Sequence, residues 1–481
     1  MENKQPQTAP ADVRENIMGT MDINPLLIKL SVPMMVSMLV QALYNVVDSI
    51  FVSHVSENAL TAVSLAFSLQ NVMIAVGVGT GVGVNALLSK SLGEKDQARA
   101  NQTAENGIFL SLCSYAVFLL IGLTCMKPYF YAQTSDMDIA RQGILYLSIC
   151  CVLSLGLFTQ TMGEKLLAAT GRTHLSMISQ LVGAVVNIVL DPIFIFVLDM
   201  GVTGAAVATV IGQFCGCILA LIFNLKKNKE IHLQFRGFRP NWRLVGNIYA
   251  IGLPSVIMVA IGSVMTFCMN KILIAYHSAK ETAATAFGIY FKLNSFIFMP
   301  VFGLNNGVVP IVAYNYGAQN RLRMVETIKR STIYASCIMV LGVVIFWAIP
   351  GPLLKIFDAT DTMLQVGVPA LRIISLSFCM AGACIALGSS FQALGKAVYS
   401  MTTSIIRQLV FLVPIAYVLA RYGYSIGNDD LVWWSYPLAE IASLLVTLVF
   451  FRRLYRTLIA PLPANGGAPV HDDSDDDPIG E

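Results

Sequence analysis

Long apolar stretches alternate with short polar segments along almost the whole chain. Twelve of these stretches reach the roughly 20 mostly apolar residues that a membrane-spanning helix needs. They lie at residues 26–52, 59–88, 104–125, 141–165, 175–198, 203–225, 247–276, 282–312, 328–350, 366–391, 399–421 and 431–452. Only 12% of the 481 residues are charged, whereas soluble domains carry about 25%. The pattern therefore predicts an all-α polytopic membrane protein with twelve transmembrane helices.

The second half of the chain repeats the first at a shift of 224 residues. The sequence GVGVNALLSKSLGEKDQAR at 81–99 matches NNGVVPIVAYNYGAQNRLR at 305–323, which aligns Gly93 with Gly317. Each half would hold six helices, and an even number gives both halves the same orientation in the membrane. We therefore expect two six-helix lobes, related as parallel repeats around a central cleft. Parallel repeats of this kind are a design of secondary transporters.

The repeat and the charges predict five segments. These are a cytoplasmic N-terminal segment at 1–25, an N-lobe of helices 1–6 at 26–225, a basic cytoplasmic linker at 226–246, a C-lobe of helices 7–12 at 247–455 and an acidic disordered tail at 456–481. Most of the 31 Lys and Arg residues fall on the side of the N-terminus. Because cytoplasmic loops carry an excess of Lys and Arg, both termini are predicted to be cytoplasmic. The inner membrane of a bacterium is the expected location.

Three acidic residues stand out within the apolar stretches: Asp48 in helix 1, Asp191 in helix 5, and Glu164 near the cytoplasmic end of helix 4. A helix rises 1.5 Å per residue, which places Asp48 and Asp191 in the outer half of the same lobe. A charged side chain at the bilayer centre costs at least ~2.5 kcal/mol. Two such acids at similar depth indicate a site that holds a proton or ligates Na⁺. The structural alternative is a hydrogen-bonded polar cluster that fixes helix packing.

Polar residues accompany these two acids. Gln41 and Tyr44 share a helix face with Asp48, and Asn187 shares one with Asp191. Thr209 approaches the acids from helix 6. Hydroxyl and amide oxygens at these positions can complete a proton or sodium site.

The sequence gives no sign of enzyme chemistry or of a cofactor. The glycine-rich segment 76–85 lacks the GK[ST] ending of a phosphate loop, and the ten cysteines lack the spacing of a zinc site. We expect no metal beyond a possible Na⁺ at Asp48 and Asp191. The basic linker is interpreted as a tether facing anionic lipid, so no nucleic-acid partner is expected. A monomer suffices, because the cleft lies between lobes of one chain.

Several motifs together resemble a known family. They are LSVP at 30–33, NVVDSIFV at 45–52, LLSKSLGE at 87–94, VVNIVLDPIFIF at 185–196 and GxxGAAxAT at 201–209. This combination resembles the multidrug and toxic compound extrusion (MATE) transporters, and is most similar to the bacterial DinF-like branch with its multidrug efflux members.

The resemblance implies a secondary antiporter with alternating access. Organic compounds, often cationic and lipophilic, would leave while H⁺ or Na⁺ enters. In members with an N-lobe site, an aspartate on helix 1 and one on helix 5 are the coupling acids, and Asp48 and Asp191 match them. The supporting polar positions match Gln41, Tyr44, Tyr146, Asn187 and Thr209, and Pro33 matches a proline associated with helix bending.

The C-lobe departs from another branch of the family, which carries acids on helices 7 and 10. Helix 7 here offers Asn270 and Lys271, and helix 10 offers no acid. Lys292 and Arg407 give this lobe a basic character, and each can serve as a structural ion partner. A possible C-lobe cavity would use Asn270, Tyr290, Lys292 and Arg407.

The alternative function is a flippase for a lipid-linked saccharide precursor. Such a protein should hold basic residues in the interior of both lobes to bind pyrophosphate. The acidic interior of the N-lobe favours the antiporter.

Overall fold

The first half of the protein is a helical lobe. The computed structural model describes residues 16–234, 236, 238–357 and 359–466. The elements of this half are α1 (Ile17–Thr20), α2 (Ile23–Ser53), α3 (Glu57–Gly93), α4 (Gln97–Thr124), α5 (Met126–Gln133), α6 (Met137–Val152), α7 (Leu155–Ala169), α8 (Thr173–Pro192), the π-helix η1 (Ile193–Val197) and α9 (Gly201–Lys226).

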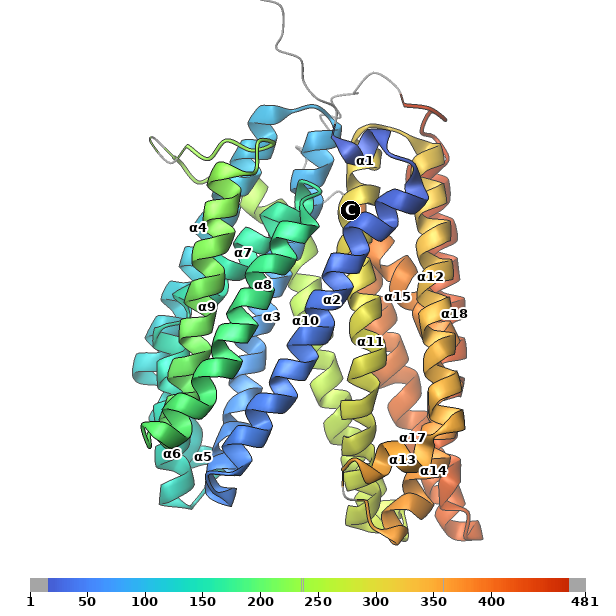
Figure 1. The fold of residues 1–481 in the computed structure, drawn as a ribbon. Coiled ribbons are helices and arrows are strands. Elements are labelled where there is room, and N and C mark those ends of the chain that lie inside the picture. Colours follow the sequence, from blue (N-terminus) through green and yellow to red (C-terminus); the bar gives the residue numbers. More distant parts are fainter. Residues whose placement is uncertain (1–15, 235, 237, 358, 467–481) are drawn as a thin grey trace, which may run out of the picture.

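The second half forms a second helical lobe beside the first (Figure 1). Its elements are α10 (Trp242–Tyr276), α11 (Lys280–Gly317), α12 (Arg321–Ala348), α13 (Pro350–Lys355), α14 (Asp361–Ser375), α15 (Phe378–Ala393), α16 (Ala397–Ile405), the π-helix η2 (Ile406–Leu412), α17 (Val413–Ile426), the 3-10 helix η3 (Asp429–Trp434), α18 (Ser435–Leu454) and the π-helix η4 (Tyr455–Ile459). The predicted all-α class is confirmed.

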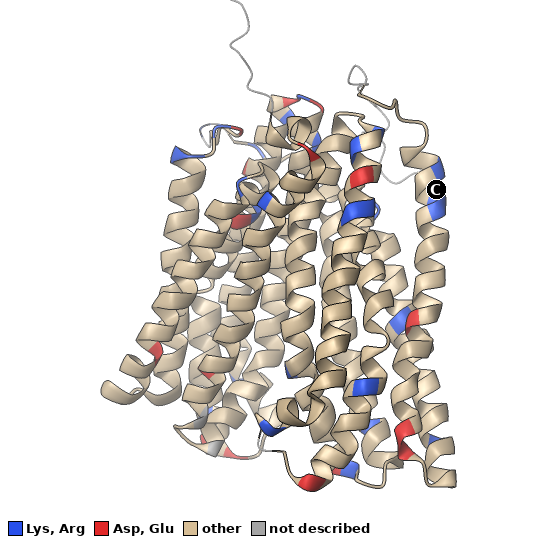
Figure 2. Cartoon of the chain, turned by 45° about the vertical axis from the view of Figure 1, so that its right-hand side comes forward, with Lys and Arg blue, Asp and Glu red and all other residues tan. Residues whose placement is uncertain are grey.

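The described residues contain ten helices that are long and apolar enough to cross a membrane, or twelve when each of two bent pairs counts as one span. The bent pairs are α6 with α7, at 47°, and α14 with α15, at 49°. The count agrees with the twelve stretches predicted from the sequence. Charged residues gather at the two ends of the molecule, with few in the band between (Figure 2). This distribution suits a chain that spans a bilayer, where every charge is costly.

The 224-residue repeat holds at the level of element boundaries. α3 ends at Gly93 and α11 at Gly317, while α8 begins at Thr173 and α16 at Ala397. Both lobes also break one span near its middle, with a serine at each break. Ser154 Oγ donates to the Cys151 carbonyl at 2.7 Å, and Ser377 Oγ donates to the Ile374 carbonyl at the same distance. Such hydroxyls compete with the helix backbone for acceptors and favour a bend.

The two lobes meet through glycine, at the end of the molecule that holds α1. A Cβ on Gly252 of α10 would lie 2.7 Å from the Gly79 carbonyl of α3, and a Cβ on Gly303 of α11 would lie 2.5 Å from the Met35 Cα of α2. The helix backbones therefore touch directly. Toward the opposite end, α2 and α10 diverge (Figure 1). Small residues allow such close approach inside membranes, and they keep the lobes closed at one end.

The N-terminal segment straps the two lobes together. The helix α1 begins beside Asn16, whose Nδ2 donates to the Thr170 carbonyl of the N-lobe at 3.3 Å. Met18 is fully buried, and its carbonyl accepts hydrogen bonds from Asn315 Nδ2 at 3.1 Å and from Arg323 at 3.0 Å. Both donors belong to the C-lobe. We call residues 16–22 the strap.

Two further segments also dock at this end. Backbone N–H groups of the linker donate to α4: His232 to Asn101 Oδ1 at 2.9 Å and Gln234 to Glu105 Oε1 at 2.8 Å. Part of the segment predicted as a disordered tail is ordered, because the Pro463 carbonyl accepts from the Arg321 N–H at 3.2 Å. Most of the predicted acidic tail, residues 467–481, lies outside the described residues, as do residues 1–15.

A Gly307→Ala substitution should open the contact between the lobes. Its Cβ would lie 2.5 Å from Ser31 Oγ and 2.8 Å from Ser31 Cα, and overpacking of this kind costs ~1–3 kcal/mol. We expect a longer distance between spin labels at Lys29 and Leu322, which are exposed. The matched control is Gly288→Ala on the same helix, where nothing lies within 4 Å of the added Cβ. Equal spin-label distances in Gly307→Ala and Gly288→Ala would contradict a close contact between the lobes at Gly307.

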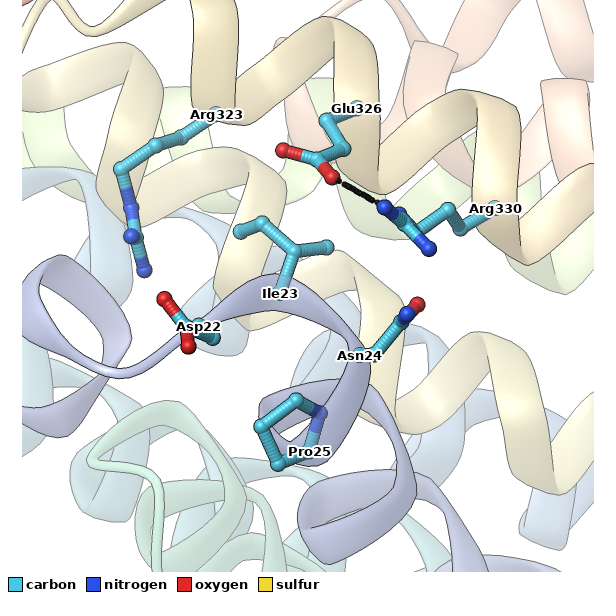
Figure 3. A pocket seen from close by; sticks show the side chains of 7 residues that line it. All are labelled: Asp22, Ile23, Asn24, Pro25, Arg323, Glu326 and Arg330. Atoms are coloured by element: carbon cyan, nitrogen blue, oxygen red, sulfur yellow. Dashed lines mark hydrogen bonds and ion pairs between the residues drawn. The ribbon is translucent and has the colours of Figure 1, made fainter.

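The strap can be tested with two arginines of α12 that line one pocket of about 290 Å³ (Figure 3). Arg323 donates to the strap at the Met21 carbonyl, 2.6 Å away, whereas Arg330 pairs within its own helix with Glu326, also at 2.6 Å. Arg323→Gln should raise hydrogen exchange at the backbone amides of residues 16–24. Arg330→Gln should leave that exchange unchanged. An equal effect of both variants would show that the pocket's charge, and not the strap, is responsible.

Candidate functional site

The structure brings Asp48 and Asp191 together in the N-lobe. Asp48 lies five residues before the end of α2, and Asp191 lies at the end of α8, which packs against α2. Their carboxyl groups lie close enough for a side-chain hydrogen bond. Two carboxyl groups can form such a bond only when one of them carries a proton. Asp191 is fully buried and Asp48 is half-buried, so the pair is accessible mainly from the side of α2.

Asn187 connects this pair to α9. It lies one helical turn before Asp191, and its Nδ2 donates to Asp191 Oδ1 and to Thr209 Oγ1, both at 3.3 Å. Thr209 in turn lies close to the Tyr44 side chain of α2. The network therefore joins three helices, α2, α8 and α9, around the two carboxyl groups.

Tyr146 of α6 completes the buried wall of the site. It is 2% exposed, and it lies within electrostatic range of Asp48. Its hydroxyl is held by two residues that the sequence analysis missed, Gln70 of α3 and Cys150 of α6. Gln41, by contrast, is exposed, and the described residues provide no hydrogen bond to its side chain.

Three oxygen atoms of this cluster are buried without a hydrogen-bond partner in the described part of the chain: Asp48 Oδ1, Asp191 Oδ2 and Asn187 Oδ1. A buried acceptor without a donor is costly, by ~1–3 kcal/mol. All three are acceptors, so they fit a proton or a cation. The described residues contain no group of three His, Cys, Asp or Glu that could hold a metal ion, and Na⁺ would need the amide and hydroxyl oxygens beside the two carboxylates.

Prolines lie next to the site and along one of its helices. Pro192 follows Asp191 directly, and the helix then widens into the π-helix η1. Proline removes an N–H from the helix ladder, and π-bulges frequently occur at functional sites. Pro33 lies inside α2, where Ser37 Oγ donates to its carbonyl at 3.1 Å. That α2 bends at Pro33 stays a prediction.

Glu164 lies in a separate cluster within the N-lobe, toward the end that holds the strap. Its two carboxylate oxygens accept hydrogen bonds from Gln160 at 2.9 Å and from Gln180 at 2.7 Å. The next residue, Lys165, is buried and donates to Asn306 Oδ1 of the C-lobe at 2.9 Å. These contacts tie α7 to α8 and to α11, so helix anchoring accounts for this pair.

The C-lobe holds an acid that the sequence analysis missed. Glu440 of α18 is 6% exposed, and its Oε2 lies 3.6 Å from a guanidinium nitrogen of Arg407. The expected basic character of this lobe is therefore partly neutralised. Lys292 is exposed and lies over the ring of Phe357, 5.8 Å from its centroid. Within the expected C-lobe set, Asn270 Oδ1 is buried without a partner among the described residues, and Tyr290 is 4% exposed.

A family model described as MatE matches residues 33–193 and 254–418, one block in each lobe and together more than half of the chain. The chain belongs to the MatE family. The resemblance found in the motifs is thereby confirmed. Asp48, Asp191 and Arg407 fall within the matched blocks, whereas Thr209 and Glu440 lie outside them.

Curated relatives of this MatE protein cover most of its length. It is 26% identical over 411 residues to the multidrug export protein MepA of Staphylococcus haemolyticus (strain JCSC1435), covering 85% of this chain and 89% of that protein. It is 25% identical over 435 residues to MepA of Staphylococcus aureus (strain MRSA252), covering 88% and 93%.

Solved structures agree on the fold. The outward-facing conformation of a multidrug resistance MATE family transporter of the MOP superfamily superimposes with a TM-score of 0.88 at 23% identity, covering 92% of this chain and 98% of that one. The predicted two-lobe architecture is therefore confirmed.

Thr209→Val tests the polar network of this MatE protein. Valine keeps the shape of threonine but removes the hydroxyl that accepts from Asn187, so the buried Asn187 amide loses one of its two acceptors. We expect the unfolding free energy to fall by ~1–3 kcal/mol, seen as a lower unfolding temperature in detergent. Thr203→Val on the same helix, at a half-buried position, is the control and should change little. A Thr209→Val protein as stable as the control would contradict the network.

Proposed function

We propose that this protein is a secondary antiporter that exports organic, often cationic and lipophilic, compounds in exchange for H⁺ or Na⁺. The family and the names of its MepA relatives support multidrug export. Asp48 and Asp191 would be the coupling acids. The observation that carries this role is their close approach in the N-lobe, with three buried acceptor oxygens left unpaired.

Exchange would follow from competition for these oxygens. When the site faces the side of high ion concentration, the unpaired acceptors take up the ion, which neutralises the cluster. When it faces the other side, the ion leaves and the carboxylates regain negative charge. A carboxylate in apolar surroundings is costly without a partner, so an ion or a cationic compound is drawn to the site in turn.

The position of the inter-lobe contact fits this cycle. The lobes touch at the end that holds the strap, whereas Asp48 lies toward the opposite end of α2. If both termini are cytoplasmic, as the charges predict, this arrangement is closed inside and faces outward. Rocking about the glycine contacts would expose the site to the cytoplasm.

One feature favours the proton over Na⁺ as the coupling ion. Asp48 and Asp191 lie close enough for a hydrogen bond between their carboxyl groups, and such a bond would require one bound proton. For Na⁺, the carboxylates would have to separate enough to admit the ion, with Asn187 Oδ1 and the Thr209 hydroxyl as further ligands. No cofactor and no enzyme activity enter this mechanism.

A flippase for a lipid-linked saccharide precursor fits the site less well. The N-lobe cluster presents unpaired acceptors, which would repel a pyrophosphate. We further propose that the protein works as a monomer in the bacterial inner membrane, on small-molecule substrates in contact with the bilayer and without a nucleic-acid partner.

Transport by proteoliposomes tests the coupling role. Wild-type protein should expel a fluorescent lipophilic cation when a proton gradient is imposed, and a separate sodium gradient tests the other ion. Asp48→Asn and Asp191→Asn should each reduce gradient-driven efflux at least tenfold while keeping the unfolding temperature of the wild type. Asp199→Asn, an exposed carboxylate just after η1, is the matched control and should retain transport.

Each outcome bears on one part of the proposal. Retained gradient-driven efflux in Asp48→Asn or Asp191→Asn would show that the coupling assignment is wrong. A wild-type protein that moves no cationic compound under either gradient would instead contradict export of lipophilic cations.

A further inference from the structure

The C-lobe contains a buried ion pair that connects two helices. Arg407 belongs to the π-helix η2, and Glu440 belongs to α18. The single close contact between them joins Arg407 Nη1 to Glu440 Oε2 at 3.6 Å. Arg407 keeps 27% of its side chain exposed, whereas Glu440 keeps 8%. The pair is therefore reachable from the arginine side.

This pair is incompletely satisfied. An arginine and a carboxylate at their strongest form two parallel hydrogen bonds at about 2.7–2.9 Å, but here one longer contact is made. The other carboxylate oxygen, Glu440 Oε1, is buried and makes no hydrogen bond in the described part of the chain; the Cys384 thiol, a weak donor, lies near the carboxylate. A buried pair recovers its desolvation cost only when the remaining atoms are hydrogen-bonded. The geometry thus leaves both an acceptor and guanidinium donors for a third group.

Aromatic side chains lie beside the pair. Tyr290 and Tyr436 are within electrostatic range of Arg407, and their ring centroids lie 6.1 Å apart. Phe287 stacks on Tyr290 at 6.1 Å, and the Tyr436 hydroxyl approaches the Met265 sulfur at 3.8 Å. Aromatic faces and thioethers adapt to flat organic molecules.

We propose that Arg407 and Glu440 form a binding site for amphoteric aromatic compounds, which carry an anionic and a cationic group close together. The anionic group would bind the exposed guanidinium of Arg407, and the cationic group would donate to Glu440 Oε1. The rings of Tyr290 and Tyr436 would hold the aromatic body. This site deepens the proposed export function and rests on it, because the ligand would be the exported compound.

Charge balance explains why both groups are needed. A purely cationic ligand would meet the positive charge of Arg407 beside the carboxylate, and a purely anionic ligand would meet Glu440. An amphoteric ligand meets an opposite charge at each point. The N-lobe site differs, since its unpaired atoms are acceptors alone and suit a cation.

Two related dyes give a direct test. Rhodamine 110 carries a carboxylate and a delocalised amino-xanthylium cation, while rhodamine 123 is its methyl ester and lacks the negative charge. Binding is measured by fluorescence anisotropy on the full-length protein in nanodiscs, without any gradient. The wild type should bind rhodamine 110 about tenfold more tightly than rhodamine 123, a difference of about 1.4 kcal/mol, because only rhodamine 110 offers a carboxylate to Arg407. Arg407→Gln should abolish this preference by weakening rhodamine 110 while rhodamine 123 binds at least as tightly as before, and Glu440→Gln should weaken both dyes.

Two further variants guard against misfolding and general charge effects. Arg407→Lys keeps the positive charge without the forked donors, and it should retain a reduced preference for rhodamine 110. Arg421→Gln, at an exposed position on the same transmembrane span, should bind both dyes like the wild type. Equal affinity of the wild type for the two dyes, or an equal loss of both in Arg407→Gln, would overturn the proposal. Because binding is measured at equilibrium, a failure of coupling at Asp48 and Asp191 would leave this result intact.

Discussion

Direct contact between helix backbones is the constraint on which the arrangement of this protein depends. Glycines on α3, α10 and α11 bring helix backbones of the two lobes into direct contact at the closed end. Any larger residue there would hold the lobes apart. The contact fixes the end of the molecule at which the two lobes converge. The cluster of Asp48 and Asp191 lies toward the other end, where the lobes diverge.

The two lobes share one plan but use it for different chemistry. Matching helix boundaries show that their backbones are repeats, yet the polar residues inside them are not equivalent. The N-lobe concentrates acceptors at Asp48, Asp191 and Asn187, while the C-lobe pairs an acid with a base at Glu440 and Arg407. Buried polar groups must be satisfied by the protein or by a ligand. The two lobes therefore differ in the ligand chemistry they call for: the N-lobe cluster offers acceptors alone, whereas the C-lobe pair offers an acceptor and donors.

Much of this could be predicted from the sequence, because hydrophobic length and helix geometry are local. The twelve spans, the repeat and the proximity of Asp48 to Asp191 all follow from span length, spacing and depth. Gln41 lies on the same helix face as Asp48 but precedes it by seven residues, which is about 10 Å along the helix. A shared helix face therefore does not bring the two side chains into contact. Glu440 escaped notice because a single acid in the apolar run YPLAEIAS leaves the hydrophobic pattern intact. The strap is too short to show a hydrophobic periodicity. Its position is set by hydrogen bonds to residues that are distant in the sequence.

The strap also has a consequence for how the chain is made. Residues 16–22 leave the ribosome before either lobe, but Asn315 and Arg323, which hold the Met18 carbonyl, are synthesised some 300 residues later. Domains generally begin to fold in the order of synthesis, and here the first segment must wait for most of the second lobe. Its docking is therefore a late step of assembly, completed only in molecules whose two lobes have both been inserted.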